Sequence, residues 1–535
     1  MADGSRSSST ASFTKKPDWV QWQMPSVADL IFLALLCTLT LTALSTRLLG
    51  DAGVGWHIRT GQQILSSHVI PRTDPFSSTM HPKPWFAWEW MYDLVVGQLD
   101  SWYGLNGVVW FTSVLIAAVF AWTFRLLILG GTNLILALVL VLLAISASMI
   151  HFFARPHVVS WLFALAWFSI LDSTERDSLE GRGSSSRWLW LLPLSMLVWV
   201  NVHGGFLFGF AFLAIFWVGC FWTWFRSDEN RIEESFQKIA AGRRLRTLTW
   251  ISVLSAVATL VNPYGWKLHQ HIYSYLSNRF LMDHIEEFQS PNFHGVAQKC
   301  FLLLLLISIA AIAARGRKLR PSELLAMLFA TYAGLIASRN IPVSSILLVL
   351  LVGPLLPSAD FSGLVQRTSA VDVRLRGHLW PVVACVVLLL IAANRGRVGS
   401  TQVMDAHFDP KRMPVGAVND LATKGLKGPV LSPDSWGGYL IYRLSPREQI
   451  VIDDRHDFYG EQTLKSYLKM IRVEPGWEEF LNQRDVSTAV LPAKSALSVV
   501  LGHTPGWKMV YSDDVATTFI RAGLTPKGTE GTSDR

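Results

Sequence analysis

The chain has few charged residues and few cysteines for its length. Of its 535 residues, only 16% are Asp, Glu, Lys or Arg, whereas 51% are hydrophobic. A soluble domain carries roughly 25% charged residues, so this composition excludes an ordinary soluble protein and indicates that lipid is the main solvent. The four cysteines lie in or at the edge of apolar segments without CxxC spacing, which argues against a zinc site or a disulfide framework.

The net charge of +8 does not indicate nucleic-acid binding. The basic residues fall in short loops between apolar runs, which is the pattern that orients membrane proteins. We therefore expect membrane lipids and no nucleic acid among the partners.

Long apolar runs recur over the first three quarters of the chain. Because about 20 apolar residues cross a bilayer, they predict a mainly α, polytopic membrane protein with about eleven transmembrane helices. The predicted spans are residues 29–49, 105–128, 132–151, 157–173, 188–201, 205–225, 249–264, 300–314, 322–338, 341–357 and 379–395. Residues 85–103 are interrupted by Glu89, Asp93 and Asp100, and predict an interfacial helix instead.

Lys and Arg concentrate in alternate loops, which by the positive-inside rule puts the N-terminus in the cytoplasm. This orientation divides the chain into four parts. We expect a flexible cytoplasmic tail (1–26), a transmembrane domain (27–395) with a large first outer loop (50–104), an extracytoplasmic α/β domain (396–525) and a disordered tail (526–535). In the α/β domain, short β-branched runs predict strands at 429–431, 438–444, 449–453, 488–491, 508–511 and 517–521.

The first outer loop, residues 49–90, is too polar for lipid and mixes charged side chains with indole rings. Carboxylates, a histidine and an arginine among tryptophans predict a sugar or phosphate site at a membrane surface. Its candidate residues are Asp51, Trp56, His57, Arg59, Trp85 and Glu89. Asp51 could instead only cap the following helix, and most tryptophans could be interfacial anchors.

Other outward turns bring further polar residues to the same side. They are ARPH with Arg155 and His157, NVHGG with His203, SRNIP with Arg339, and HIEEF with Glu286 and Glu287. The spans themselves hold almost no charge at mid-depth, where a transporter would place ionisable residues. This favours an enzyme acting at one interface. Bland alternatives stay open: Pro156 could end a span, the glycines after His203 could form a reversal, and the glutamates could be a solvated face.

Asp453 and Asp454 follow the apolar run IVI, at a position where open α/β sheets commonly bind ligands. With Glu286 and Glu287 they form a second candidate acidic site, although a charged turn on a docking face is the favoured interpretation of Asp453 and Asp454. Hard cations require several oxygen ligands. We therefore expect neither a metal site nor a cofactor, with a divalent metal as the less favoured alternative.

One long span, an outer loop that opens with Asp51, many further spans and an outer α/β domain together resemble the GT-C glycosyltransferases. The segments GWHIRTGQQIL, ARPH, NVHGG, NPYGW, WGGYLIY and VIDDRHDFYG also resemble a widespread bacterial family of uncharacterised multi-pass membrane proteins, which implies a bacterial cytoplasmic (inner) membrane. In GT-C enzymes Asp-Glu or Asp-x-Asp is often found in the first loop. Here Ala52 and Gly53 follow Asp51, which argues against a paired-carboxylate mechanism and against a metal site in this loop.

The GT-C resemblance implies a polyprenyl-phosphate-linked sugar donor and a lipid, glycan or protein acceptor. Asp51 would be the general base that takes the proton of an acceptor hydroxyl. Arg155 and Arg339 would bind the donor phosphate, with Arg59 and His57 as second choices. A transporter or flippase of a lipid-linked substrate, or a non-catalytic scaffold for envelope assembly, are the alternative functions.

Overall fold

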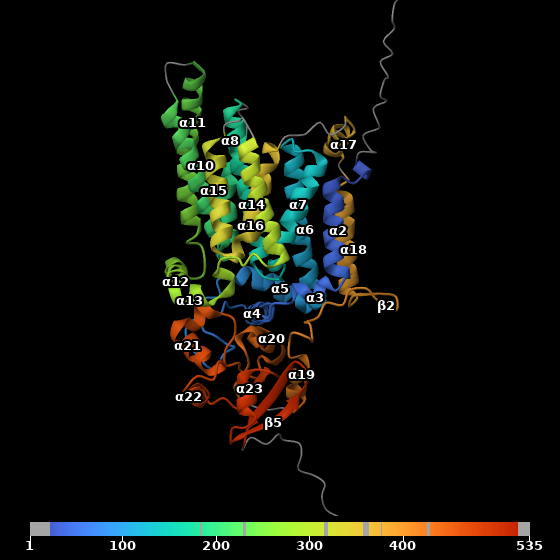
Figure 1. The fold of residues 1–535 in the computed structure, drawn as a ribbon, viewed down its shortest axis with the longest axis vertical. Coiled ribbons are helices and arrows are strands. Elements are labelled where there is room, and N and C mark those ends of the chain that lie inside the picture. Colours follow the sequence, from blue (N-terminus) through green and yellow to red (C-terminus); the bar gives the residue numbers. More distant parts are fainter. Residues whose placement is uncertain are drawn as a thin grey trace, which may run out of the picture.

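The computed structural model describes residues 22–181, 185–227, 232–314, 319–356, 363–375, 377–424 and 428–522. Most of the predicted tail 1–26 and all of the tail 526–535 lie outside the described residues. The described chain forms a bundle of long helices with a smaller α/β domain at one end (Figure 1).

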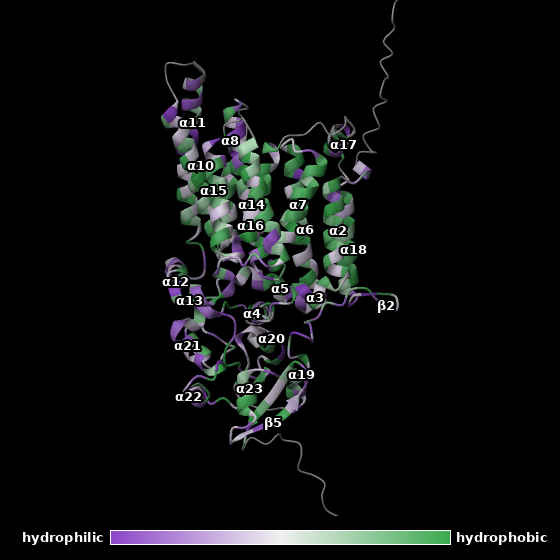
Figure 2. Ribbon diagram, in the orientation of Figure 1, coloured by the Kyte–Doolittle hydropathy of each residue, from purple (hydrophilic) through white to green (hydrophobic). Residues whose placement is uncertain are grey.

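A helix occupies each of the predicted spans. The bundle helices are α2 (Val27–Leu41), α6 (Leu105–Leu129), α7 (Leu134–Ser148), α8 (His157–Leu179), α9 (Leu191–Trp199), α10 (Leu207–Arg226), α11 (Ile232–Ala258), α14 (Val296–Ala314), α15 (Pro321–Ile336), α16 (Ile341–Val352) and α18 (Leu379–Ala393). Apolar residues cover them, and hydrophilic residues gather at both ends of the bundle (Figure 2).

Six helical segments of the described chain are long and apolar enough to cross a membrane, or seven if α17 (Gly363–Arg374) and α18, which meet at a bend of 60°, count as one span. The chain is therefore a multi-pass membrane protein, but the predicted count of about eleven spans is not confirmed. Helix length is the reason: α2, α9 and α15 hold 15, 9 and 16 residues, fewer than a straight crossing needs.

Small residues and buried aromatic rings pack the bundle. A methyl group added at Gly219 of α10 would lie 2.8 Å from the backbone nitrogen of Ser322 at the start of α15. Trp167 of α8 and Trp199 of α9 are fully buried with ring centroids 5.6 Å apart. Close backbone approach and ring packing hold helices together in lipid, where the hydrophobic effect does not.

The first loop forms two helices, α4 (Val54–Ser67) and α5 (Trp90–Tyr103), which lie between the bundle and the C-terminal domain (Figure 1). They cross closely because Gly61 lacks a side chain: an added methyl group would lie 1.8 Å from the carbonyl oxygen of Asp93. Helix α20 (Asp434–Leu444) of the C-terminal domain approaches α4 in the same way, through Gly55 and Gly438. Glycines thus place the loop between the two parts of the molecule.

The C-terminal domain is a small α/β unit, as predicted. Its sheet has the strand order β3-β4-β6-β5, with β3 and β4 parallel and the other pairs antiparallel. The strands are β3 (Val430–Leu431), β4 (Thr488–Pro492), β5 (Trp507–Ser512) and β6 (Ala516–Arg521), and the other helices are α19 (Val415–Lys424), α21 (His456–Ile471), α22 (Glu478–Gln483) and α23 (Ala496–Leu501).

Two predicted strands of this domain are wrong. Residues 438–444 belong to helix α20, whose residues 436–441 are all buried, so no one-sided helical periodicity marks the sequence. Residues 449–453 make only isolated bridges, from Ile450 to Ser77 of the first loop and to Val430.

Candidate functional site

A cavity of about 810 Å³ lies where the first loop, the turns of the bundle and the C-terminal domain meet. Most of the predicted site residues line it. These are Asp51, Trp56, Trp85, Glu89, Arg155, His157, His203, Glu286, Glu287, Arg339 and Asp454. The turns that the predicted topology puts on one side of the membrane converge at this cavity.

Arg155 is placed between two carboxylates from distant parts of the chain. Its Nη1 lies 2.8 Å from Oδ2 of Asp454 and 3.5 Å from Oδ1 of Asp51. Trp56 donates from Nε1 to Oδ1 of Asp454 at 3.0 Å, and its ring lies 5.5 Å below the guanidinium. Burial raises the pKa of Asp454 to about 6, although Arg155 acts against that rise. The C-terminal domain therefore contributes a residue to the cavity.

Asp51 does not cap helix α4. Its Oδ1 accepts the backbone N–H of Gly53 at 2.8 Å, whereas the capping residue of α4 is Gly53 itself. A methyl group at Gly53 would lie 1.5 Å from Nη1 of Arg155 and 2.3 Å from Oδ2 of Asp454. The Asp-Ala-Gly sequence thus leaves room for an arginine beside Asp51.

Arg455, next to Asp454, forms buried ion pairs that join the C-terminal domain to the first loop. It donates to Asp453 from Nε and Nη2 and to Asp74 from Nη1, at 2.7–3.0 Å. Its guanidinium also lies 4.7 Å from the ring centroid of Trp85. Asp453, predicted as a site residue, is fully buried in this pairing and does not line the cavity. The charged-turn interpretation is right for Asp453, while Asp454 faces the cavity.

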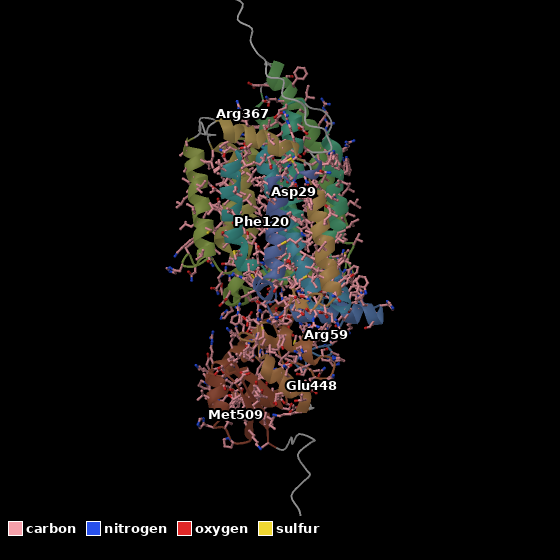
Figure 3. All side chains as sticks on the ribbon, turned by 90° about the vertical axis from the view of Figure 1, so that its right-hand side faces the viewer. Asp29, Arg59, Phe120, Arg367, Glu448 and Met509 are labelled. Atoms are coloured by element: carbon pink, nitrogen blue, oxygen red, sulfur yellow. The ribbon has the colours of Figure 1, made fainter. Side chains whose placement is uncertain are left out.

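Two further candidates, His57 and Arg59, are also outside the lining. Arg59 donates from Nε to the carbonyl of Tyr442 at 2.8 Å and so joins α4 to α20. It lies at the junction of bundle and C-terminal domain (Figure 3). His57 is fully buried beneath Glu89, and its Nδ1 lies 2.6 Å from Oδ1 of Asp93. The helical turn of α4 directs Trp56 to the cavity and its neighbour His57 into α5.

Glu89 lies on the inner wall of the cavity between two imidazoles. Its Oε2 is 3.8 Å from Nε2 of His57, and its Oε1 is 3.8 Å from Nε2 of His203. Burial raises the pKa of Glu89 to about 8, against the opposing charge of Arg155. A carboxyl group in this position holds its proton at neutral pH.

On the opposite wall, Arg339 pairs with Glu287 at 3.2 Å and lies over the ring of Phe288. Burial acts to raise the pKa of Glu287, but the positive charges around it, Arg339 first, lower that pKa below its ordinary value. His157 contacts the carbonyl of His151 through Nε2 at 2.8 Å. This wall carries a paired arginine at the edge of the bundle.

A second cavity of about 910 Å³ continues from this wall into the bundle. It shares His157, His203, Glu287 and Arg339 with the first cavity. Beyond them the lining is mostly apolar, with Leu207, Phe208, Ile272, Leu276, Met282, Phe329, Ile336 and Val343. A polar chamber thus opens directly onto an apolar groove.

Several functional candidates were not predicted. Asp434, His456 and Asp457 line the cavity from the C-terminal domain, and His456 bonds Asp434 through Nε2 at 2.8 Å. Asp93 lies one helical turn after Glu89, a spacing that could have indicated a shared face. Nothing in the sequence marks Asp434, because its proximity depends on the docking of the C-terminal domain.

Within the described ranges, no three His, Cys, Asp or Glu side chains are grouped to hold a metal ion. Between Asp51 and Asp454 the positive charge is that of Arg155. These residues do not fit a metal at this place, and no step below uses one.

Together the helical bundle, the loop helices at its end and the docked α/β domain define a multi-pass membrane protein with the GT-C fold. The archaeal oligosaccharyltransferase AglB from Archaeoglobus fulgidus, solved in complex with an inhibitory peptide and a dolichol-phosphate, has this fold, at TM-score 0.53 and 10% identity over 93% of this chain and 74% of that one. The predicted GT-C resemblance is therefore confirmed for the fold.

A second Archaeoglobus fulgidus oligosaccharyltransferase structure, a complex with Zn and sulfate, matches at TM-score 0.41 and 11% identity over 92% of this chain and 72% of that one. No protein-family model matches the chain, and no curated protein is significantly similar to it in sequence.

Proposed function

We propose that this protein is a membrane glycosyltransferase that moves a sugar from a polyprenyl-phosphate donor to an acceptor hydroxyl of a lipid, glycan or protein. The observation that carries the proposal is the polar cavity with Arg155 and Arg339 that opens onto an apolar groove. A donor with an anionic head and a long apolar tail needs both surfaces side by side. The dolichol-phosphate in the archaeal neighbour supports a lipid-linked donor.

The two arginines would bind the donor phosphate. Arg339 lies at the border of the two cavities, where the head of a lipid whose tail fills the groove would come to rest. Arg155 uses Nη1 for both Asp454 and Asp51, which leaves the rest of its fork to grip phosphate oxygens. Positive charge here would stabilise the phosphate as it departs.

Asp51 would be the general base. Its side chain lines the cavity, is 31% exposed and is oriented by the backbone N–H of Gly53 and by Arg155. In this role it takes the proton from the acceptor hydroxyl while that oxygen attacks the anomeric carbon. Trp56 and Trp85 form part of the wall against which a sugar ring would pack.

We further propose that the reaction takes place on the outer face of a bacterial cytoplasmic membrane. Basic residues, among them Arg176, Arg187, Arg226 and Arg320, belong to loops and helix ends that alternate with the turns of the cavity. By the positive-inside rule these loops are cytoplasmic, which puts the cavity and the C-terminal domain outside.

The test uses purified protein in lipid nanodiscs and a panel of polyprenyl-phosphate sugars, beside Asp51→Asn. We expect transfer by the wild type and a kcat about 10²–10⁴-fold lower in the variant, with donor affinity retained. Transfer that is unchanged in Asp51→Asn would keep the enzyme class and remove Asp51 as the base. No transfer and no donor binding across the panel would favour a transporter or a scaffold.

A further inference from the structure

Glu89 has a setting that none of the roles above uses. It lines the cavity with 8% of its surface exposed, and each carboxyl oxygen faces an imidazole nitrogen, Nε2 of His57 or Nε2 of His203, at 3.8 Å. At 3.8 Å neither pair is a hydrogen bond, but both nitrogens are near neighbours of the carboxyl group. The carboxyl group therefore has a nitrogen partner ready on each side.

The tautomer of His203 follows from its second nitrogen. Nδ1 accepts the backbone N–H of Gly205 at 3.0 Å, and an amide N–H can only donate. The neutral ring must then carry its proton on Nε2, the nitrogen that faces Glu89. Ser160, which receives the indole N–H of Trp199 at 2.8 Å, lies 2.9 Å from Nδ1 and fixes the ring.

His57 is held differently, because its Nδ1 shares a proton with Asp93. The Nδ1–Oδ1 distance is 2.6 Å, both side chains are fully buried, and Nε2 of His57 has no hydrogen-bond partner among the described residues. Burial raises the pKa of Asp93 and lowers that of His57, so the shared proton lies on Asp93 and the neutral ring carries its own proton on Nε2, which faces Glu89. Transfer of the shared proton to Nδ1 would make an imidazolium that still carries Nε2–H. His57 therefore presents a donor to Glu89 in both cases.

We propose, on the basis of the glycosyltransferase function above, that Glu89 is the general acid that protonates the departing phosphate, and that His57, Asp93 and His203 are positioning residues that stabilise the carboxylate left behind. This assigns different tasks to two carboxyl groups of one cavity, as in enzymes where one carboxyl stays protonated by burial and another acts as base.

The proton balance is complete. The acceptor hydroxyl gives its proton to Asp51, and its oxygen forms the bond to the anomeric carbon. The bond from that carbon to the phosphate oxygen breaks, the electron pair stays on that oxygen, and the oxygen takes the proton of Glu89. Nε2–H of His203 and Nε2–H of His57 then face the new carboxylate. Asp51 afterwards loses its proton to water and Glu89 regains one.

Electrostatics agree with a protonated Glu89 in the resting site. Burial raises its pKa to about 8, and burial also raises the pKa of Asp93. Charged groups face Glu89 from four other elements. They are Arg155 in the turn before α8, Glu287 in the short helix Glu286–Phe288, Arg339 in the short helix Ser338–Asn340, and Asp457 in α21.

The experiment is the pH dependence of transfer by the full-length protein in nanodiscs, with a polyprenyl-phosphate sugar that supports turnover. For the wild type we expect kcat to fall as pH rises through about 8, because Glu89 then loses its proton. Glu89→Gln should lower kcat about 10²–10⁴-fold with an unchanged donor KM, and should abolish this alkaline limb. Glu461→Gln, which removes a surface carboxyl paired with Lys465, is the control and should match the wild type.

Asp457→Asn keeps the proposal testable if Glu89→Gln does not fold. The ionised Asp457 raises the pKa of Glu89, so a neutral amide in its place should move the alkaline limb to lower pH while transfer persists. Transfer by Glu89→Gln at the wild-type rate, or an alkaline limb that neither variant changes, overturns this inference and leaves the proposed function standing. Failure of the wild type with every donor overturns both.

Discussion

Arg155 and Arg455 are both held between two aspartates beside Trp56, yet the protein uses them differently. Arg455 is 2% exposed in its side chain, bonds Asp453 and Asp74 through three nitrogens and packs on aromatic rings. Arg155 is 21% exposed, and among the described residues it bonds Asp51 and Asp454 through Nη1 only. Arg455 therefore bonds the protein through three side-chain nitrogens, whereas Arg155 does so through one.

The difference separates an arginine that joins two parts of the molecule from the one that we propose binds the donor phosphate. The guanidinium offers five N–H donors in a fixed fork. When buried carboxylates use the fork from several sides, the result is a junction, here between the first loop and the C-terminal domain. When one nitrogen is used and the side chain lines a cavity, as for Arg155, donors remain for the proposed phosphate.

Arg455→Met should have the largest effect, because it leaves Asp453 and Asp74 buried without their partner. Removing one member of a buried ion pair costs roughly 3–5 kcal/mol, so we expect the C-terminal domain to detach from the first loop. Limited proteolysis and thermal unfolding in nanodiscs measure this. Arg447→Met, which removes an exposed arginine of the same domain, is the control. Equal melting temperatures for the two variants would contradict the junction.

Arg155→Lys should leave the fold intact and weaken donor binding. Lysine keeps the charge but loses the fork, and a lost charge-assisted hydrogen bond of roughly 1.5–3 kcal/mol corresponds to about 10–100-fold in affinity. Titration of the protein in nanodiscs with polyprenyl phosphate measures the change. Arg443→Lys, on the exposed side of α20, should bind like the wild type. A melting temperature that falls while affinity stays the same would make Arg155 a second junction instead.

The helical framework was predictable because apolar runs of span length leave no other choice for their backbone. The number of crossings was not, since α9 and α2 are shorter than the apolar runs that contain them. Residues 438–444 were predicted as a strand because burial on all sides of α20 removes the periodicity that separates helix from strand.

The site was predictable at the level of turns but not of single side chains. The predicted topology alone puts Asp51, Arg155, His203 and Arg339 on one side of the membrane, and the structure brings them to one cavity. It cannot tell Asp453 from Asp454, adjacent residues of which one is buried with Arg455 and the other faces Arg155. That choice depends on the docking of the C-terminal domain, which pairs Trp56 with a residue 398 positions away.

Asp454→Asn should have the smallest effect on stability. Whether the variant is more or less stable than the wild type shows whether Asp454 holds the C-terminal domain in place. The pKa of Asp454 is raised from 3.8 to about 6 in the folded protein, so the folded state binds this proton more tightly than the unfolded state does. Its ionised form therefore destabilises the fold above pH 6, and this cost disappears as pH falls below the unfolded value. At pH 7.5 we expect the variant to be more stable by about 1 kcal/mol, with part of the effect screened by water in the cavity.

The same measurement at pH 4 should give nearly equal stability for variant and wild type, because both then carry a neutral side chain at position 454. Thermal unfolding in nanodiscs between pH 4 and 8 tests this. A variant that is less stable at pH 7.5 would mean that the pair of Asp454 with Arg155 holds the domain in place as Arg455 does. The contrast between the two arginines would then be one of exposure and not of function.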